Sequence, residues 1–284
     1  MQDKHHPRPT PPWRATVQWL LLLSAGLQAT AIAHAASAAV ATSEYSDTGP
    51  RSLKQFRPFS PPPSTGAQPS ADPRDFAGAY ILNPVEQYLR PIRGGDRLPS
   101  GDVIPPFTPY AAAIFWRRVE AADKGAPLPD PSVRCEPSWK TRTSSLMQFM
   151  QTPSLMVIFF AEHHIVRLIH LDEQRQPAAL KPSYMGHSIG HWEGDTLVID
   201  TVGFNDRGWF DFAGTPQSTQ LHLVERMTKQ KDGSIEDLMT FTDPTLFRHS
   251  FETRDMYRLQ APKDAQMDEE ICEQNERNYD LAVH

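Results

Sequence analysis

Residues 182–209, which read PSYMGHSIGHWEGDTLVIDTVGFNDRGW, decide the fold. Residues 187–191 form a short strand candidate, and residues 196–204 form a longer one that is rich in β-branched and apolar side chains. Glu193-Gly194-Asp195 between them has the composition of a tight turn. Two strand-like runs around such a turn predict a β-hairpin, and we expect it to be the centre of a β-rich domain.

Further strand candidates lie on both sides of this hairpin. They are apolar or alternating runs, and turn-forming pairs such as Asp232-Gly233 and Asp243-Pro244 separate them. The runs cover residues 146–150, 155–161, 164–171, 220–229, 235–242 and 247–259, after a first strand that starts near Asp75. About eight strands at short spacing, without a βαβ rhythm, predict a mainly β chain that forms an antiparallel sandwich or barrel, and of the two we expect a single antiparallel β-barrel.

The first 75 residues differ in composition from the rest. A basic residue, Arg14, precedes an apolar run that ends at Ala33-His34-Ala35, which is typical of a cleaved secretory signal peptide over residues 1–35. An uncleaved membrane anchor is the alternative. We therefore expect a periplasmic or secreted protein with no integral membrane segment after cleavage. Residues 36–75 are rich in Ala, Ser and Pro, which predicts a disordered linker.

The domain itself is expected over residues 76–262. Thr108 and Pro109 have the residue types of an N-cap and a first helical position, so we predict a helix near residues 109–122 as a short helical lead-in. Residues 263–284 form an acidic C-terminal strap. Cys135 and Cys272 are the two cysteines, and in an oxidising compartment they favour one disulfide, with two free thiols as the alternative.

The net charge narrows the class of partner. The chain has 28 Lys and Arg against 34 Asp and Glu, a formal charge of −6. An acidic balance argues against nucleic acid or an anionic membrane as the main partner. We expect a small-molecule ligand or substrate instead, and the oligomeric state is left open.

A shared metal site at His187 and His191 is the first candidate for chemistry. On a strand these residues share a face but lie about 13 Å apart, from a rise of about 3.3 Å per residue. Zn–N bonds are about 2 Å long, so the pair cannot hold one ion. We therefore expect no metal. The sequence has no P-loop and no G-x-G-x-x-G motif, and we expect no cofactor.

Histidines and carboxylates on strands are the candidates for acid–base catalysis. We select His164, His187, Asp200 and His222, since a histidine beside a carboxylate is a natural general base or acid. Glu162 and His164 would share a strand face that lines either the barrel interior or a polar, solvent-facing edge. Asp200 interrupts an apolar strand.

Asp200 is therefore either a reactive group or one half of a structural ion pair, with Arg167 or Arg226 as partner. Glu225 and Arg226 are expected to form a cross-strand ion pair. Glu162, Asn205 and Trp209 are candidate ligand-binding residues, the last two because they leave a strand for a loop at a barrel mouth.

The hairpin also resembles a large family of uncharacterised secreted bacterial proteins. Their shared pattern is G-x-S-(I/V)-G-x-W-E-G-D-T-L-V-(V/I)-(D/E)-T-x-G-F-(N/D), and residues 186–205 match it throughout. Many relatives have a histidine where this chain has Gln217, which cannot exchange protons in its place. The resemblance implies no reaction, and the likeness of the strand pattern to lipocalin or calycin barrels is an analogy of fold.

Three functions follow as hypotheses. The first is binding of a hydrophobic or aromatic small molecule in a pocket inside the barrel. The second is a cofactor-free lyase, isomerase or hydrolase that uses a histidine and a carboxylate. The third is a structural module of the cell envelope.

Overall fold

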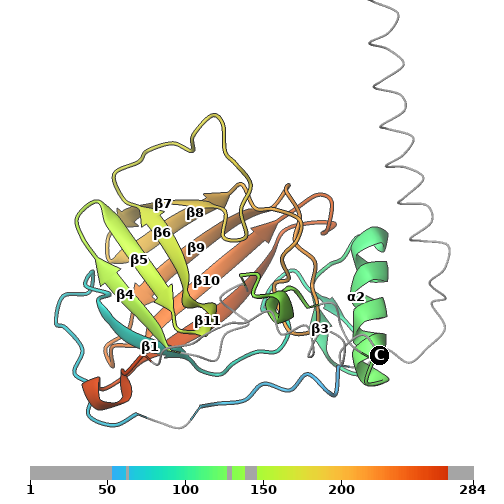
Figure 1. The fold of residues 1–284 in the computed structure, drawn as a ribbon, viewed down its shortest axis with the longest axis horizontal. Helices are drawn as coiled ribbons and strands as arrows, with labels where there is room; N and C mark the ends of the chain where they lie inside the picture. The colour runs from blue at the N-terminus through green and yellow to red at the C-terminus, as the bar shows by residue number, and fades with distance from the viewer. Residues whose placement is uncertain (1–52, 62–63, 127–129, 138–145, 268–284) are drawn as a thin grey trace, which may run out of the picture. The chain divides into compact units, whose positions relative to one another are not determined.

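The computed structural model describes residues 53–61, 64–126, 130–137 and 146–267. Their main feature is a closed barrel with strand order β1-β11-β10-β9-β8-β7-β6-β5-β4, in which β1 also pairs with β4 (Figure 1). This confirms the predicted mainly β fold with a barrel. The predicted signal peptide and Cys272 lie outside the described residues, so both the cleavage and the disulfide stay predictions.

The elements follow the predicted runs closely. The barrel strands are β1 (Gly78–Leu82), β4 (Met147–Gln151), β5 (Leu155–Phe160), β6 (Ile165–His170), β7 (His187–Glu193), β8 (Thr196–Val202), β9 (His222–Lys229), β10 (Ile235–Thr242) and β11 (Phe251–Leu259). The other elements are the short strands β2 (Asp96–Arg97) and β3 (Val103–Ile104), the helix α2 (Pro109–Asp123), and the 3-10 turns η1 (Pro131–Arg134), η3 (Glu162–His164) and η4 (Pro262–Asp264).

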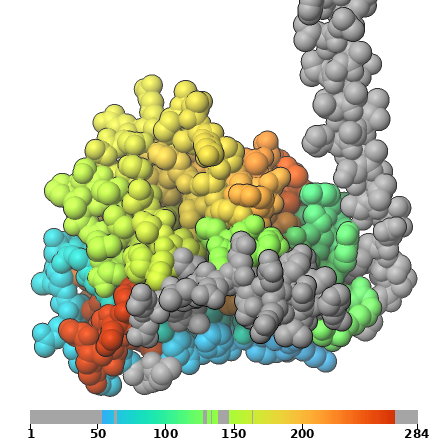
Figure 2. Space-filling model, viewed as in Figure 1, coloured from blue at the N-terminus to red at the C-terminus, as the bar shows by residue number. Residues whose placement is uncertain are grey.

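The predicted hairpin is β7 and β8. Glu193 pairs with Thr196, and Gly194 takes the positive φ of 60° that the two-residue turn requires. One pairing corrects the prediction of a purely antiparallel barrel, because β6 and β7 run parallel. The connection over residues 171–186 returns the chain to the same end of the sheet before β7 begins. This loop projects from the barrel in yellow in Figure 1 and forms a ridge in Figure 2.

Large side chains fill the inward positions of the barrel. Its apolar core includes Phe149, Phe160 and Tyr257, all essentially inaccessible to water. At its centre Arg167 forms a buried ion pair with Glu225, through both guanidinium Nη atoms. The hydrophobic pocket expected inside the barrel therefore finds no support, because packed side chains occupy these inner positions.

The electrostatics of Arg167 explain how this charge is tolerated. Burial alone would lower the pKa of Arg167, but Glu225, Asp237 and Tyr257 act in the opposite direction, and the net shift is upward. The guanidinium also donates to the hydroxyls of Ser188 and Thr201. The cation therefore stays charged inside the barrel, with hydrogen bonds that offset part of its desolvation cost.

Helix α2 extends the core beyond the barrel. Its N-cap is Thr108, whose side chain accepts a hydrogen bond from the backbone N–H of Ala111, as predicted from the Thr-Pro pair. Phe115 of the helix lies 4.8 Å from Phe107, ring centre to ring centre, and Phe107 lies 5.9 Å from Phe247. This aromatic series connects the helix to the segment between β10 and β11. No helix among the described residues is long and apolar enough to cross a membrane.

Part of the predicted linker packs against the barrel. Leu53 is fully buried, and Phe59 forms a backbone bridge with Val85. Lys229 of β9 donates from Nζ to three backbone carbonyls between Ser70 and Asp75. The described portion of residues 36–75 is thus held by buried apolar side chains and by hydrogen bonds from Lys229, Arg258 and Gln151, contacts that its Pro- and Ala-rich composition does not reveal.

Candidate functional site

A row of polar side chains lies on the outer wall of the barrel, where β6 ends and β7 begins. It contains His170, Glu173, Gln176, His187, Asp200 and His222. His170 is the last residue of β6, and His187 is the first of β7. Glu173 and Gln176 come from the loop between these strands. Three of the four predicted catalytic residues therefore lie in one hydrogen-bonded row.

The alternation of side chains along the strands places these residues outside the barrel. Ser188 and Thr201 are buried, so their neighbours in β7 and β8 face outward, and Asp200 is one of these neighbours. Asp200 thus lies on the outer face of the barrel and does not line its interior. Asp200 forms hydrogen bonds with Gln176 and His222 rather than an ion pair with Arg167 or Arg226.

The hydrogen bonds of Asp200 determine which atoms in the row carry protons. Its Oδ2 lies 2.7 Å from Nε2 of His222. Nε2 of Gln176 lies 2.9 Å from Oδ1 of Asp200 and 3.0 Å from its backbone carbonyl oxygen. An ionised carboxylate and a carbonyl only accept hydrogen bonds, so the amide of Gln176 must turn its NH2 group toward Asp200. Its Oε1 then lies 3.0 Å from Nδ1 of His187, which must carry a proton to donate.

The same reasoning assigns the tautomer of His222. Its Nε2 must donate to Asp200, so a neutral ring has its lone pair on Nδ1. Nδ1 has no hydrogen-bond partner among the residues that the structure describes, and the side chain is 45% exposed. His222 is therefore a ring held in one tautomer by a carboxylate, with its basic nitrogen accessible to solvent.

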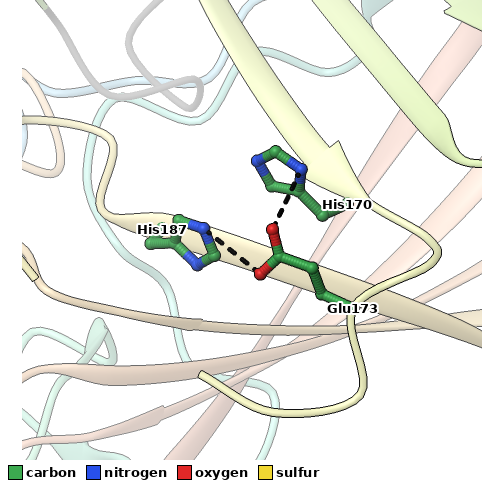
Figure 3. A group of neighbouring side chains, drawn as sticks. All are labelled: His170, Glu173 and His187. Carbon is green, nitrogen blue, oxygen red and sulfur yellow. Dashed lines mark ion pairs between the residues drawn. The ribbon is translucent and has the colours of Figure 1, made fainter. Parts of the chain in front are cut away.

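The other end of the row is a cluster of two histidines and a glutamate (Figure 3). Oε1 of Glu173 lies 3.4 Å from Nδ1 of His170, and Oε2 lies 3.6 Å from Nε2 of His187. The two imidazole rings stack with centres 5.0 Å apart and planes 11° apart. One ligand atom from each residue lies within 4.8 Å of the others, which is close enough for one metal ion. The expectation of no metal considered only His187 with His191, and it missed this group.

Glu162 and His164 lie elsewhere. They belong to the 3-10 turn η3 rather than to a strand, and His164 has a positive φ of 49°. The strand begins only at Ile165, so these two residues lie at the opposite end of β6 from His170. The outward face of β6 is solvent-exposed, with Val166 and Leu168 nearly half exposed, which corrects the alternative in which this face lined the interior.

Asn205 and Trp209 are buried and form contacts that hold loops in place. Asn205 is buried and accepts a hydrogen bond from the backbone N–H of Arg207. Trp209 is buried under the guanidinium of Arg118, which lies 4.2 Å from its ring centre. Gln217 is also buried, and its Nε2 donates to the carbonyl of Tyr184. These contacts stabilise loops, and none of them joins the polar row.

The predicted ion pair between Glu225 and Arg226 does not form, because neighbours on a strand face opposite sides. Glu225 points inward to Arg167, and Arg226 points outward to Glu193. Sequence reasoning also missed Glu173 and Gln176 as site residues. They lie in a loop without a local motif, and only the spacing of His170 and Glu173 at the end of a strand offered a signal.

Comparison of the chain with models of known protein families, with curated proteins and with solved structures found no match. The functional argument therefore depends on the geometry of the polar row itself.

Proposed function

We propose that the protein is an enzyme of the acid–base class, a hydrolase, isomerase or lyase, with His222 as the general base. The observation that carries this proposal is the 2.7 Å contact between Asp200 and His222, in which Asp200 is itself held by Gln176. Asp200 acts as a positioning residue, because it holds the ring in one tautomer and stabilises the imidazolium that forms.

The chemistry follows from the free nitrogen of His222. Nδ1 can remove a proton from a water molecule or from a substrate hydroxyl or acidic C–H group, and it can return that proton to a leaving group. The outward position on the barrel wall gives a substrate access without any opening of the barrel. The substrate class that fits is polar, since the row offers hydrogen-bonding groups.

The packing of the barrel favours a site on its outer wall over a ligand-binding site in its interior. Arg167 and the aromatic core residues occupy inward positions where a hydrophobic ligand would have to bind. The proposal therefore moves the small-molecule site from the interior to the outer wall. The signal-like residues 1–35 support a periplasmic or secreted setting for this activity.

The first test measures the tautomers by NMR of 15N-labelled histidine. His222 should carry its proton on Nε2, and Asp200→Asn should weaken this preference while leaving the fold intact. His222 with its proton on Nδ1 in the native protein would contradict the proposal.

The second test measures turnover on a panel of esters, phosphoesters and substrates with an acidic C–H bond. His222→Gln should lower any turnover about 100-fold or more, because general acid–base catalysis contributes roughly 10²–10⁴-fold. His191→Gln is the matched control, since His191 is an exposed histidine of β7 that contacts Glu193. Equal turnover in the native protein and His222→Gln, or no turnover on any member of the panel, would count against the proposal.

A further inference from the structure

We propose that His170, Glu173 and His187 bind one divalent transition-metal ion of the zinc class. The site is distinct from the acid–base pair, and it does not depend on His222 being a base. Two imidazole nitrogens and one carboxylate are ligands that Zn²⁺ accepts, and three protein ligands with open positions are typical of catalytic rather than structural zinc sites.

The fold brings the three ligands together from separate places. In the parallel pair of β6 and β7, His170 lies opposite Ile189, so His187 is one outward-facing position away on the neighbouring strand. Glu173 follows β6 by three residues, and its carboxylate lies beside the stacked rings with one oxygen facing each of them (Figure 3). No rearrangement of the strands is needed to present all three side chains to one point.

The orientation of Gln176 makes the cluster more than a chance group of polar residues. Because Gln176 turns its carbonyl oxygen to His187, the proton of a neutral His187 is on Nδ1 and the lone pair is on Nε2. That lone pair faces Oε2 of Glu173 at 3.6 Å. Two electron-rich atoms that face each other repel unless a positive charge lies between them. Either a second proton on His187 or a divalent cation bound by both atoms removes this conflict, and the cation also uses the carboxylate oxygen that faces His170.

The distances suit such an ion. Metal–ligand bonds of about 2.0–2.2 Å at tetrahedral angles place ligand atoms about 3.3–3.6 Å apart. The two contacts of Glu173 measure 3.4 and 3.6 Å, and the three ligand atoms lie within 4.8 Å of one another. The two rings are stacked, so both must turn about their side-chain bonds until their lone pairs point to the ion.

The surroundings also fit a metal site. The side chains of the three ligands are 23–35% exposed, so an ion can enter and a water molecule can occupy an open position. A metal-bound histidine usually donates its other ring N–H to an oxygen acceptor, which fixes the tautomer. Gln176 supplies this acceptor for His187, and Asp200 holds Gln176 in turn. Gln176 is thus a positioning residue for the metal ligand.

The test is titration of the metal-free full chain with Zn²⁺ by calorimetry, and with Co²⁺ by visible absorption. The native protein should bind one equivalent of zinc, and the cobalt spectrum should show nitrogen and oxygen ligands at low coordination number. His170→Ala, Glu173→Gln and His187→Ala should each weaken zinc binding about 100-fold or more. Gln176→Met should weaken it about 10–100-fold, as is usual for the loss of an outer-shell partner.

His191→Ala is the matched control and should bind zinc as the native protein does, since this histidine lies on the same strand but outside the cluster. Circular dichroism of each variant separates loss of ligand from loss of fold. Absence of zinc and cobalt binding in the native chain would overturn the proposal. So would undiminished binding in folded Glu173→Gln and His187→Ala, or NMR signals that show His187 protonated on both nitrogens in the presence of zinc.

His222→Gln separates this site from the acid–base proposal. The variant should lose turnover yet keep the zinc affinity of the native protein. A His222→Gln protein that loses zinc would instead place His222 among the ligands and contradict the assignment made here.

Discussion

Replacement of Arg167 by methionine should lower the free energy of unfolding by about 3–5 kcal/mol, the usual cost of breaking a buried ion pair from one side. Methionine keeps most of the length of the arginine stem, so the change removes charge and donors rather than volume. Glu225 has no exposed surface, and in the variant its carboxylate loses the guanidinium without any compensation from water.

The loss in free energy of unfolding should depend on which partner of the ion pair is replaced. Burial opposes the charge of Arg167, while Glu225 and then Asp237 favour it, so the cation serves two buried carboxylates. Arg167→Met removes the cation from both, whereas Glu225→Gln leaves Arg167 beside Asp237. We therefore expect Glu225→Gln to cost less than Arg167→Met. The double variant Arg167→Met/Glu225→Leu should recover part of the loss, because apolar replacement of a buried pair is often neutral or stabilising. Recovery stays incomplete because Asp237 remains buried without the cation.

Urea unfolding followed by tryptophan fluorescence measures these differences, since the chain has six tryptophans. The expected loss corresponds to a Tm that is about 6–20 °C lower, at about 2–4 °C per kcal/mol for a domain of this size. The deficit of Arg167→Met should shrink as the pH falls, because protonation removes the uncompensated carboxylate charge in the folded state. An Arg167→Met protein within about 1 kcal/mol of the native one would refute the reasoning, as would a double variant no more stable than the single one.

Three further predictions concern the local structure. Gly186→Ala should lower the free energy of unfolding by at least about 2 kcal/mol, because the new Cβ would lie 2.7 Å from the backbone carbonyl oxygen of Val202. Gly194→Ala should lower it by only about 1 kcal/mol, because its Cβ meets no atom within 4 Å. Urea unfolding compares the two variants. Asp211→Ala should cost about 3 kcal/mol or more in thermal melts, because this buried carboxylate accepts three hydrogen bonds. Burial and the nearby charge of Asp75 raise the pKa of Tyr80 from 10.0 to about 12. The tyrosine of the unfolded chain therefore ionises first, and part of the stability should be lost between pH 10 and about 12. Tyr80→Phe should lose less stability over this range in alkaline unfolding titrations.

The local elements were predictable because short-range patterns determine them. The hairpin of β7 and β8 follows from two β-rich runs and a Gly-Asp turn, and the helix α2 follows from Thr108 and Pro109. Strand β10 has the predicted bounds of residues 235–242. In each of these cases the residues that decide the structure are neighbours in the sequence.

The faces of the strands were harder to predict. In β8 both faces carry apolar residues, with Ile199 directed inward and Val198 on the outer face, so period-two alternation did not reveal where Asp200 points. Arginine is a residue type that usually lies on the surface, yet Arg167 lies inside the barrel. Only its pairing with Glu225 makes that position tolerable, and such a pair between distant strands leaves no local trace.

Residue types and local patterns are enough to identify the class of fold, most strand positions and His187, Asp200 and His222 as reactive candidates. The tertiary structure alone decided which of these side chains meet. Closure of the barrel and the parallel pairing of β6 with β7 bring His170 beside His187, and the intervening loop adds Glu173. Register across strands depends on packing over the whole barrel, so residues that are distant along the chain become neighbours only when the barrel closes.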